Sequence, residues 1–178
     1  MAAQSAVGER VASEAAFSGA DFRNALGAFA TGVTVITTRG DDELAYGMTA
    51  NAFSSLSLDP PLVLVCVIAG TQGAEEIERN GTFAVNILGS HQEPISRFFS
   101  WRDRPRGADA FSEIPHHTAV TNCPLLKGAA AYLDCRLADK HVAGDHVIYI
   151  GEVLGLGVDP TAKPLLFHGG SYCKVAQQ

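Results

Sequence analysis

The chain is poor in charged residues and has a small excess of acidic ones. Only 18% of its 178 residues are charged, the formal net charge is −6, and the 13 Lys and Arg residues are spread along the chain. A nucleic-acid partner requires a clustered basic face on the protein, so we expect none. Because 47% of the residues are hydrophobic, the composition predicts one compact domain with a sizeable core.

Long apolar runs and closely spaced cysteines are also missing. No apolar run approaches the length that spans a membrane. The first twenty residues carry Glu9, Arg10 and Glu14, whereas a signal peptide would be apolar there. The four cysteines form no Cys-x-x-Cys pair: they are Cys66, Cys123, Cys135 and Cys173. We therefore expect reduced thiols, a cytoplasmic location, no membrane partner and no zinc site.

Several catalytic signatures are absent as well. The chain contains no Gly-x-Ser-x-Gly elbow and no P-loop. Gly155 and Gly157 form a Gly-x-Gly pair, but Pro160 follows where a dinucleotide-binding helix would begin, which excludes a Rossmann fingerprint. The six histidines include no helical His-x-x-x-His pair, so we expect no metal ion.

What the chain does have is a series of β-prone segments. Runs of β-branched and other apolar residues predict at least six strands, and a polar hairpin leads from the first of them into a strand that begins near Ala45. The other predicted strands cover residues 33–38, 62–68, 82–88, 129–138, 146–156, 165–168 and 171–175. Hairpin-like connections and few helices point to a closed or partly closed antiparallel barrel, a mainly β fold.

Three short helices complete the prediction. Asp21 is expected to cap the first helix, which Gly32 ends, and the other two lie at about 74–80 and 90–99. Residues 100–122 are rich in Arg, Pro, Asp and His and predict a long covering loop.

The domain organisation is simple. We expect residues 1–18 to form a loose arm ahead of one domain at 19–178. The strand at 146–156 is apolar on both alternating faces, which predicts that a second subunit covers one of them.

The stretch from Ala45 to Val67 holds a dense row of hydroxyl and amide side chains between two apolar segments. The row consists of Thr49, Asn51, Ser54, Ser55 and Ser57. Such donors at a strand edge can hold a polyoxygenated or phosphorylated ligand. The same composition is also typical of an ordinary Ser-rich turn between two strands.

Six fragments occur together in a fixed order. They are Thr31–Thr38, Gly47–Ser55, Asp59–Pro61, Phe83–Leu88, Gly144–His146 and Pro164–Tyr172. In this order and spacing, residues 22–175 closely resemble the short-chain flavin reductases, the reductase components of two-component flavin-dependent monooxygenases. The resemblance implies a six-stranded antiparallel split barrel and a homodimer with FAD or FMN near the subunit interface. It also implies oxidation of NADH, in preference to NADPH, and delivery of reduced flavin to a separate monooxygenase.

The resemblance also implies roles for individual residues. Flavin-binding positions are Val33, Thr34, Thr49, Ala50, Asn51, Ser54, Ser55, Cys66, Val67 and Thr71. The loop at 69–73 departs from the family pattern because it has no basic residue. We therefore expect the flavin phosphate to be held weakly, as suits a flavin that diffuses away as a substrate.

Gly144-Asp145-His146 resembles the family signature for the nicotinamide side of the site. His146 is the predicted catalytic residue, with Asp145 fixing its tautomer, and both belong to the predicted NADH site. His168 and Tyr172 are predicted to line that pocket too, with core packing as the alternative role. For His146 the alternative is a structural histidine at the start of a strand.

Two other functions stay open. One is a split-barrel flavoprotein with tightly bound FMN, similar to pyridoxine-phosphate oxidases, although the basic residues that such a site requires are scarce. The other is a flavin-binding module without turnover, against which Gly144-Asp145-His146 argues. Hydride transfer between two cofactors requires positioning more than an acid or a base, which fits the absence of the usual catalytic signatures.

Overall fold

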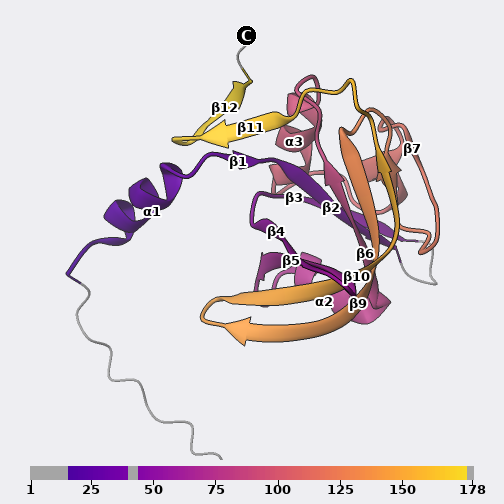
Figure 1. The fold of residues 1–178 in the computed structure, drawn as a ribbon, viewed down its shortest axis with the longest axis horizontal. Helices are drawn as coiled ribbons and strands as arrows, with labels where there is room; N and C mark the ends of the chain where they lie inside the picture. Colours follow the sequence, from indigo (N-terminus) through magenta and orange to yellow (C-terminus); the bar gives the residue numbers. More distant parts are fainter. Residues whose placement is uncertain (1–15, 40–43, 176–178) are drawn as a thin grey trace, which may run out of the picture.

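The computed structural model describes residues 16–39 and 44–175 (Figure 1). Its helices are α1 (Gly19–Gly27), α2 (Gln72–Asn80), α3 (Glu93–Ser100) and α4 (Ala108–Phe111). The predicted arm at 1–18 therefore lies almost wholly outside the described residues. None of the described helices is both long and apolar enough to cross a membrane.

The regular secondary structure of the described residues is mainly β, with few helices, as predicted. The strands are β1 (Thr31–Gly32), β2 (Thr34–Arg39), β3 (Ala45–Ala50), β4 (Phe53–Leu58), β5 (Pro61–Ile68), β6 (Thr82–Ile87), β7 (His116–His117), β8 (Leu125–Leu126), β9 (Ala131–Ala143), β10 (His146–Val158), β11 (Leu165–His168) and β12 (Ser171–Lys174). β2, β6 and β5 form where β-branched residues recur, since such side chains pack well on a pleated surface.

The main sheet has seven strands, not the six that the resemblance implies. Its order is β3-β2-β6-β9-β10-β5-β4, with every neighbouring pair antiparallel. The additional strand is β4, which pairs with β5 through Phe53↔Val65 and Ser55↔Val63. This segment is the Ser-rich stretch for which the composition also allowed a turn.

The last two strands do not join the main sheet, contrary to the expectation that they complete it. β11 and β12 pair with each other, and β11 also pairs with β1, so that the three strands form a separate small sheet. The physical reason is local: the short β1 at Thr31–Gly32 supplies the partner edge immediately before β2 begins.

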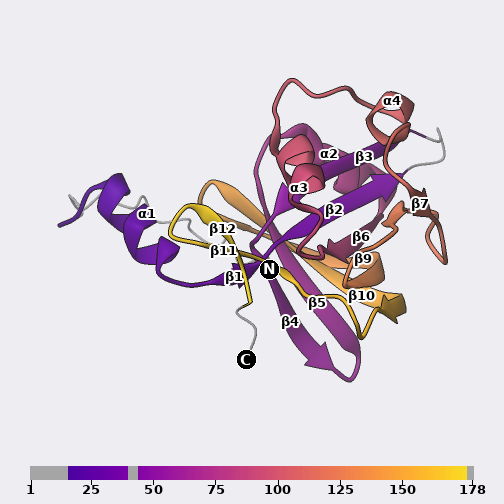
Figure 2. The ribbon, with the colours of Figure 1, turned by 90° about the horizontal axis from the view of Figure 1, so that it is seen from above.

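The main sheet curls so that its two outer strands approach each other (Figures 1 and 2). β3 and β4 are at opposite ends of the strand order, yet only Asn51 and Ala52 separate them in the chain. In the described part of the chain no ladder joins β3 to β4, so the barrel is not closed. The candidate site lies beside the inner side of this opening, where β3 faces β5.

Two large hydrophobic clusters form most of the core of the described residues, beside a small third one at Ala84, Cys123 and Leu125. One lies between the curled sheet and α2 and includes Ile36, Val65, Ile77, Phe83 and Tyr149. The other lies under α3 and α4 and includes Val35, Leu88, Phe99, Phe111 and Leu165. The clusters contact opposite faces of β2, because Val35 and Ile36 are successive residues of one strand.

The predicted covering loop is folded against the sheet. It contains α4 and β7, and buried polar groups fasten its later part. The Asn86 side chain donates to Pro124 O at 3.3 Å and accepts from Leu126 N at 2.7 Å. The buried Asp134 carboxylate accepts hydrogen bonds from the backbone N–H groups of Val120 and Thr121 at 2.8 and 3.0 Å.

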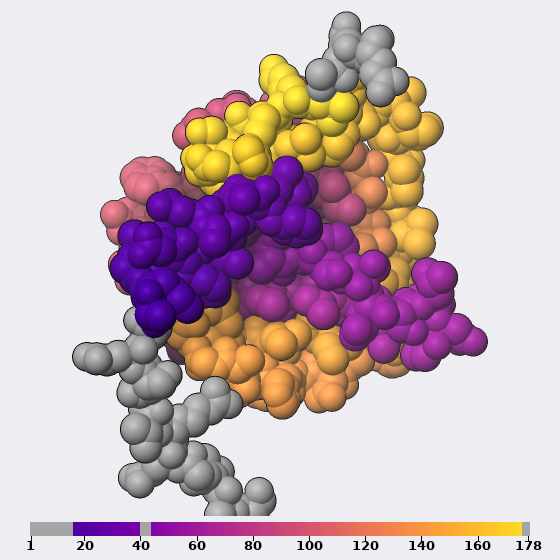
Figure 3. Space-filling view, turned by 60° about the vertical axis from the view of Figure 1, so that its left-hand side comes forward, coloured from indigo at the N-terminus to yellow at the C-terminus, as the bar shows by residue number. Residues whose placement is uncertain are grey.

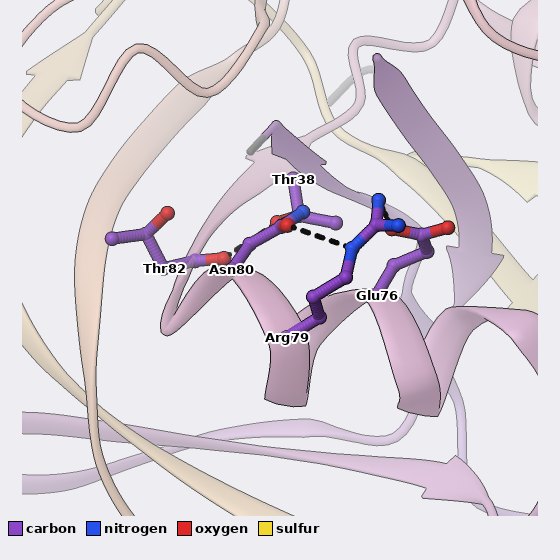
Figure 4. A network of polar contacts seen from close by, with 5 residues as sticks. All are labelled: Thr38, Glu76, Arg79, Asn80 and Thr82. Carbon is purple, nitrogen blue, oxygen red and sulfur yellow. Dashed lines mark hydrogen bonds and ion pairs between the residues drawn. The ribbon is translucent and has the colours of Figure 1, made fainter. Parts of the chain in front are cut away.

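The C-terminal end of α2 is tied to the sheet by a polar network (Figure 4). Asn80 Nδ2 donates to Thr38 Oγ1 at 3.0 Å, and Thr38 Oγ1 donates to Thr82 O at 2.7 Å. Arg79 Nε donates to Asn80 Oδ1 at 3.4 Å and pairs with Glu76. Gly81 ends the helix with φ 65°, a left-handed conformation that glycine adopts without strain. Because this end is fixed, the other end of α2 has a defined position at the candidate site.

α1 stands apart from the rest of the fold. It has no buried residue and projects from the body in Figure 1, and its surface lies beside the β11–β12 segment in Figure 3. Ser18, not Asp21, is the N-cap. Asp21 completes a capping box by accepting from Ser18 N at 3.0 Å. The helix ends at Gly27 rather than at Gly32, because the chain turns into β1.

Candidate functional site

A cleft with a volume of about 820 Å³ opens between β3, β5, the start of α2 and the segment after α3. Its lining consists of Tyr46, Met48, Thr49, Ala50, Asn51, Ala52, Cys66, Val67, Ile68, Gly70, Thr71, Gln72, Phe99, Ser100, Arg102, Arg104, Arg106 and His146. The volume lies within the usual range for small-molecule and cofactor sites, about 300–1,000 Å³.

The floor of the cleft comes from β3 and β5. Ala50, Cys66 and Val67 give it an apolar surface. Thr49 Oγ1 donates to Ser96 O at 2.6 Å, so this hydroxyl fastens α3 to β3. Asn51 Nδ2 lies 3.4 Å from Thr31 Oγ1, and its exposed amide leaves other hydrogen-bonding groups for a ligand. The floor can therefore hold a flat apolar group with a polar edge.

His146 lies beside the end of β5. It pairs with Ile68 in the sheet, and the preceding loop is held by a hydrogen bond of 2.9 Å from Ala69 N to Asp145 O. Gly144 has φ 64°, which lets the β9–β10 connection turn tightly. His146 is thus fixed in backbone position while its ring faces the cleft.

Asp145 and His146 interact through their side chains. His146 Nδ1 lies 2.7 Å from Asp145 Oδ1. The hydrogen bond from His146, together with the charge interaction between the two groups, lowers the pKa of the Asp145 carboxyl. An ionised carboxylate can only accept a hydrogen bond, so Nδ1 of His146 carries the hydrogen. Nε2 is then the ring nitrogen available to a ligand.

The end of the cleft at the start of α2 is formed by Tyr46, Thr71 and Gln72. Thr71 is the N-cap of α2: its Oγ1 accepts from Ala74 N at 3.5 Å and donates to Ile68 O at 2.7 Å. The N-terminus of α2 opens into the cleft beside these residues. The unpaired N–H groups and the dipole of a helix start favour an anion there.

Three arginines line the same end, and the sequence analysis did not single them out. Arg102, Arg104 and Arg106 all come from the segment between α3 and α4. Arg104 Nη1 donates to Trp101 O at 2.8 Å, Nη2 donates to Gly47 O, and the guanidinium lies 5.3 Å from the centroid of the Tyr46 ring. The cleft therefore has the basic groups that the loop at 69–73 lacks.

The structure brings seven of the predicted site residues to one cleft. They are Thr49, Ala50, Asn51, Cys66, Val67, Thr71 and His146. These residues come from β3, β5, the start of α2 and the start of β10, elements that are far apart in the sequence.

Four predicted flavin-binding residues lie outside the lining. Val33 and Thr34 are buried, and Thr34 Oγ1 donates to Ala50 O at 2.6 Å, so Thr34 supports the floor from behind. Ser54 and Ser55 are exposed on β4, where Ser54 Oγ donates to Ser55 O at 3.0 Å. Their assignment rests on the resemblance.

Three residues of the predicted NADH site also lie outside the lining. Asp145 contacts the site through His146. His168 is exposed on β11, and Tyr172 on β12 is hydrogen-bonded to Ser96 Oγ at 2.8 Å with the Arg97 guanidinium 4.8 Å from its ring centroid. Within one chain, the contacts of Tyr172 are packing contacts, which is the alternative role that the sequence left open.

Sequence reasoning missed more than the arginines. Tyr46, Met48 and Phe99 also line the cleft. Alternation on β3 provides a signal for the first two, because Tyr46, Met48 and Ala50 share one face of the strand. The arginines stand at every second position of the segment, but this spacing gave no indication that they approach the cleft.

The four cysteines are free. Burial raises the pKa of the Cys66 thiol, and burial likewise raises the pKa of Cys135 to about 12. Cys66 is half-buried and lines the cleft, whereas Cys123 and Cys135 belong to the core. In residues 16–39 and 44–175, no three His, Cys, Asp or Glu side chains gather as a metal site would require.

Comparison with known proteins gives a consistent result. A family model described as "Flavin reductase like domain" matches residues 26–176. An NADH-dependent flavin reductase from a Rhodococcus species is 41% identical over 152 residues, 84% of this chain and 82% of that protein. The reductase subunit HsaB of a flavin-dependent monooxygenase from Mycobacterium tuberculosis is 39% identical over 153 residues, 85% of this chain and 79% of that protein.

Solved structures agree with these relatives. The NADH:FAD oxidoreductase SgcE6 of Streptomyces globisporus, in complex with NAD and FAD fragments, matches with a TM-score of 0.81 and 36% identity. The match covers 88% of this chain and 92% of that one.

Proposed function

The chain belongs to the family of flavin reductase-like domains, and we propose that it is an NADH-dependent flavin reductase. It transfers a hydride from NADH to FAD or FMN and supplies the reduced flavin to a partner monooxygenase. The main support for this proposal is that one cleft is lined by Ala50, Asn51, Cys66, Val67 and His146.

The residues of the cleft fit a flavin. The apolar floor of Ala50, Cys66 and Val67 suits the face of the isoalloxazine ring, and the exposed amide of Asn51 suits its polar edge. Thr71 and the start of α2 suit a phosphate. These groups would hold the flavin, which itself supplies the redox chemistry.

The role of the protein is then to position two nucleotides and to keep water from the contact between them. His146 is held by Asp145 through Nδ1 and presents Nε2 at the edge of the cleft. From there it would orient the nicotinamide against the face of the flavin ring that is turned away from the floor. A positioning role needs neither a nucleophile nor a carboxylate pair.

Assembly and location follow from the same proposal. We infer a homodimer, since Phe22 and Leu26 on α1 and Phe29 just after it expose 52 to 77% of their surface, and Leu156 exposes 63% on β10. We further propose that the curled seven-stranded sheet corresponds to the split barrel of the family. The cytoplasm remains the predicted location, in keeping with four free cysteines.

A direct assay tests the function. The purified protein is mixed with NADH and either FMN, FAD or riboflavin, and absorbance in the nicotinamide band is followed. We expect flavin-dependent oxidation of NADH, slower with NADPH. No flavin-dependent oxidation with any of the three acceptors would contradict the proposal.

The same preparation separates the alternatives. A diffusible flavin is lost on desalting, and activity then depends on added flavin. Flavin retained in stoichiometric amount would instead favour the FMN-containing flavoprotein, and bound flavin without NADH oxidation would favour the binding module.

A further inference from the structure

The segment after α3 places an unusual amount of positive charge on one side of the cleft. Arg102, Arg104 and Arg106 line it, in a chain whose formal net charge is −6. Arg102 and Arg106 are exposed, and neither has a hydrogen-bond or ion-pair partner within the described residues. Asp103, which lies between them in the sequence, is not part of the lining. Two cationic side chains are thus available to a ligand.

Arg104 differs from its two neighbours because it is already engaged. Its guanidinium donates to the carbonyl groups of Trp101 and Gly47 and lies over the rings of Tyr46 and Phe99, at 5.3 and 6.0 Å from their centroids. These contacts join the segment to β3 and α3. Arg104 therefore holds the segment in place, and Arg102 and Arg106 extend from a fixed base.

The second anion-favouring feature lies next to the arginines. A Cβ atom at Gly73, in the first turn of α2, would lie 2.4 Å from Met48 Sδ and 3.2 Å from Tyr46 Cε1, so the helix start packs on Met48 and on the edge of the ring that Arg104 covers. Tyr46 thus separates the helix N-terminus from the arginine segment. Helix N–H groups and guanidinium groups both bind phosphate oxygens, the latter often in bidentate geometry.

The direction of β3 relates this end of the cleft to the flavin. β3 runs from Tyr46, at the arginine end, to Ala50, beside Asn51. Four residues of strand span about 13 Å, comparable with the length of an extended FMN molecule. A flavin whose ring lies at Ala50 and Asn51 and whose chain follows β3 therefore brings its phosphate to Tyr46.

We propose that Arg102 and Arg106 bind the phosphate group of the flavin nucleotide, opposite the N-terminus of α2, and so determine the preference for FMN and FAD over riboflavin. The inference rests on the proposed function, since it requires a flavin in the cleft. It also replaces the expectation of weak phosphate binding, which was drawn from the loop at 69–73 alone.

Flavin binding without turnover tests the proposal. Dissociation constants for FMN and riboflavin are measured by flavin fluorescence on the wild-type protein and on the double variant Arg102→Gln/Arg106→Gln. We expect the ratio of Kd for FMN to Kd for riboflavin to rise at least about tenfold in the double variant, because charge-assisted hydrogen bonds to the phosphate are lost. Raising the salt concentration should weaken FMN binding to the wild type more than riboflavin binding.

The matched control is Arg136→Gln. Arg136 is exposed, pairs with Glu152 and lies outside the cleft lining. Its replacement by Gln removes one positive charge, as each of the two cleft substitutions does. We expect its FMN-to-riboflavin ratio to equal that of the wild type. Far-ultraviolet circular dichroism of each variant shows whether the fold is retained.

Two other outcomes would contradict the proposal, and a third would contradict only the proposed function. An unchanged ratio in the folded double variant would mean that the arginines do not contact the flavin phosphate. A raised KM for NADH with riboflavin as acceptor and an unchanged ratio would assign them to the phosphates of the nicotinamide nucleotide. If the wild type binds flavin but does not oxidise NADH, the proposed function fails while the ratio still tests the arginines.

Discussion

At the scale of single residues, the site places side chains that are available to a ligand next to side chains that are already hydrogen-bonded within the protein. Asp145 is bound to His146, which leaves Nε2 of the imidazole for a ligand. Arg104 is bound to backbone carbonyls, which leaves Arg102 and Arg106 exposed. In both cases the engaged group restricts the conformations of the available one, and so reduces the entropy that ligand binding must overcome.

Replacing His146 by Ala tests its positioning role. We expect the rate of NADH oxidation to fall by roughly 10- to 100-fold, the range typical of a positioning or proton-handling side chain, while the Kd for FMN changes little. Stopped-flow absorbance under single-turnover conditions measures the hydride-transfer step directly.

His141→Ala is the control for that change. His141 is exposed on the same hairpin, opposite Ile148, and does not line the cleft. It should leave the rate unaltered. An unchanged rate and NADH affinity in His146→Ala would assign His146 a structural role instead.

Cys66 reports where the flavin lies. It lines the cleft, whereas Cys173 is half-buried on β12 outside the lining. We expect saturating FMN to slow iodoacetamide alkylation of Cys66 by about tenfold and to leave Cys173 unaffected. Cys135 should stay unmodified in both states, because burial raises the pKa of its thiol to about 12 and the thiolate is the reactive form. Peptide mass spectrometry of a time course gives the rates, and equal rates at Cys66 with and without FMN would place the flavin elsewhere.

At the scale of secondary-structure elements, β3 is the organising strand of the site. Its residues line the cleft, its Thr49 hydroxyl binds α3, and its Gly47 carbonyl accepts from Arg104. A Cβ atom on Gly47 would lie 2.5 Å from Cε1 of the buried Phe99 and 3.1 Å from Cζ of Phe111. Only glycine at this position allows α3 and α4 to pack directly on the strand.

The substitution Gly47→Ala should therefore lower the stability of the fold. Overpacking of this kind destabilises a protein by about 1–3 kcal/mol, and the displaced α3 should also move the arginine segment and weaken FMN binding. Urea unfolding and flavin fluorescence measure the two effects. Gly32→Ala is the control, since a Cβ atom there meets nothing within 4 Å. Equal stability of the two variants would contradict the packing argument.

The sequence predicts an element well where the residues of that element alone favour its structure, and poorly where contacts with distant residues determine it. The strand predicted at 33–38 is seen as β2 at Thr34–Arg39, because β-branched side chains favour a strand, and α2 ends at Asn80, where the predicted helix ended. The sequence did not distinguish β4 from a turn, because apolar and polar residues do not alternate regularly along it. The segment is a strand because it pairs with β5.

The same distinction applies to the site. Thr49 and Asn51, at the end of β3, and His146 of the Gly-Asp-His segment could be singled out because each belongs to a local sequence pattern. The arginines were missed because their approach to the cleft depends on how α3 packs on β3 through Gly47 and Thr49. Such a tertiary contact leaves no periodicity in the sequence.

At the scale of the whole molecule, the exposed apolar surface of α1 is the feature that a single chain does not explain. Its apolar residues lie on a helix with no buried position, beside the β11–β12 segment (Figure 3). A second copy of the chain is the partner that the proposed function supplies.

The double variant Phe22→Ser/Leu26→Ser should weaken the dimer. Burial of each such side chain contributes about 1.5–3 kcal/mol, so the dimer dissociation constant should rise by about 10²–10⁴-fold. Sedimentation velocity over a concentration series measures it, with the exposed polar Asn24→Ala on the same helix as control. A wild-type protein that is monomeric and fully active would rule out the dimer.

The incomplete closure of the main sheet has a consequence for the behaviour of the protein at high concentration. Free strand edges can recruit strands from other chains and so begin aggregation. Here both free edges, on β3 and β4, turn toward one gap because only Asn51 and Ala52 connect them. β4 also contains a register shift between Ser55 and Ser57, and such irregularities disrupt the regular spacing that an added strand would need. The two free edges therefore offer little regular backbone to which a further strand could add.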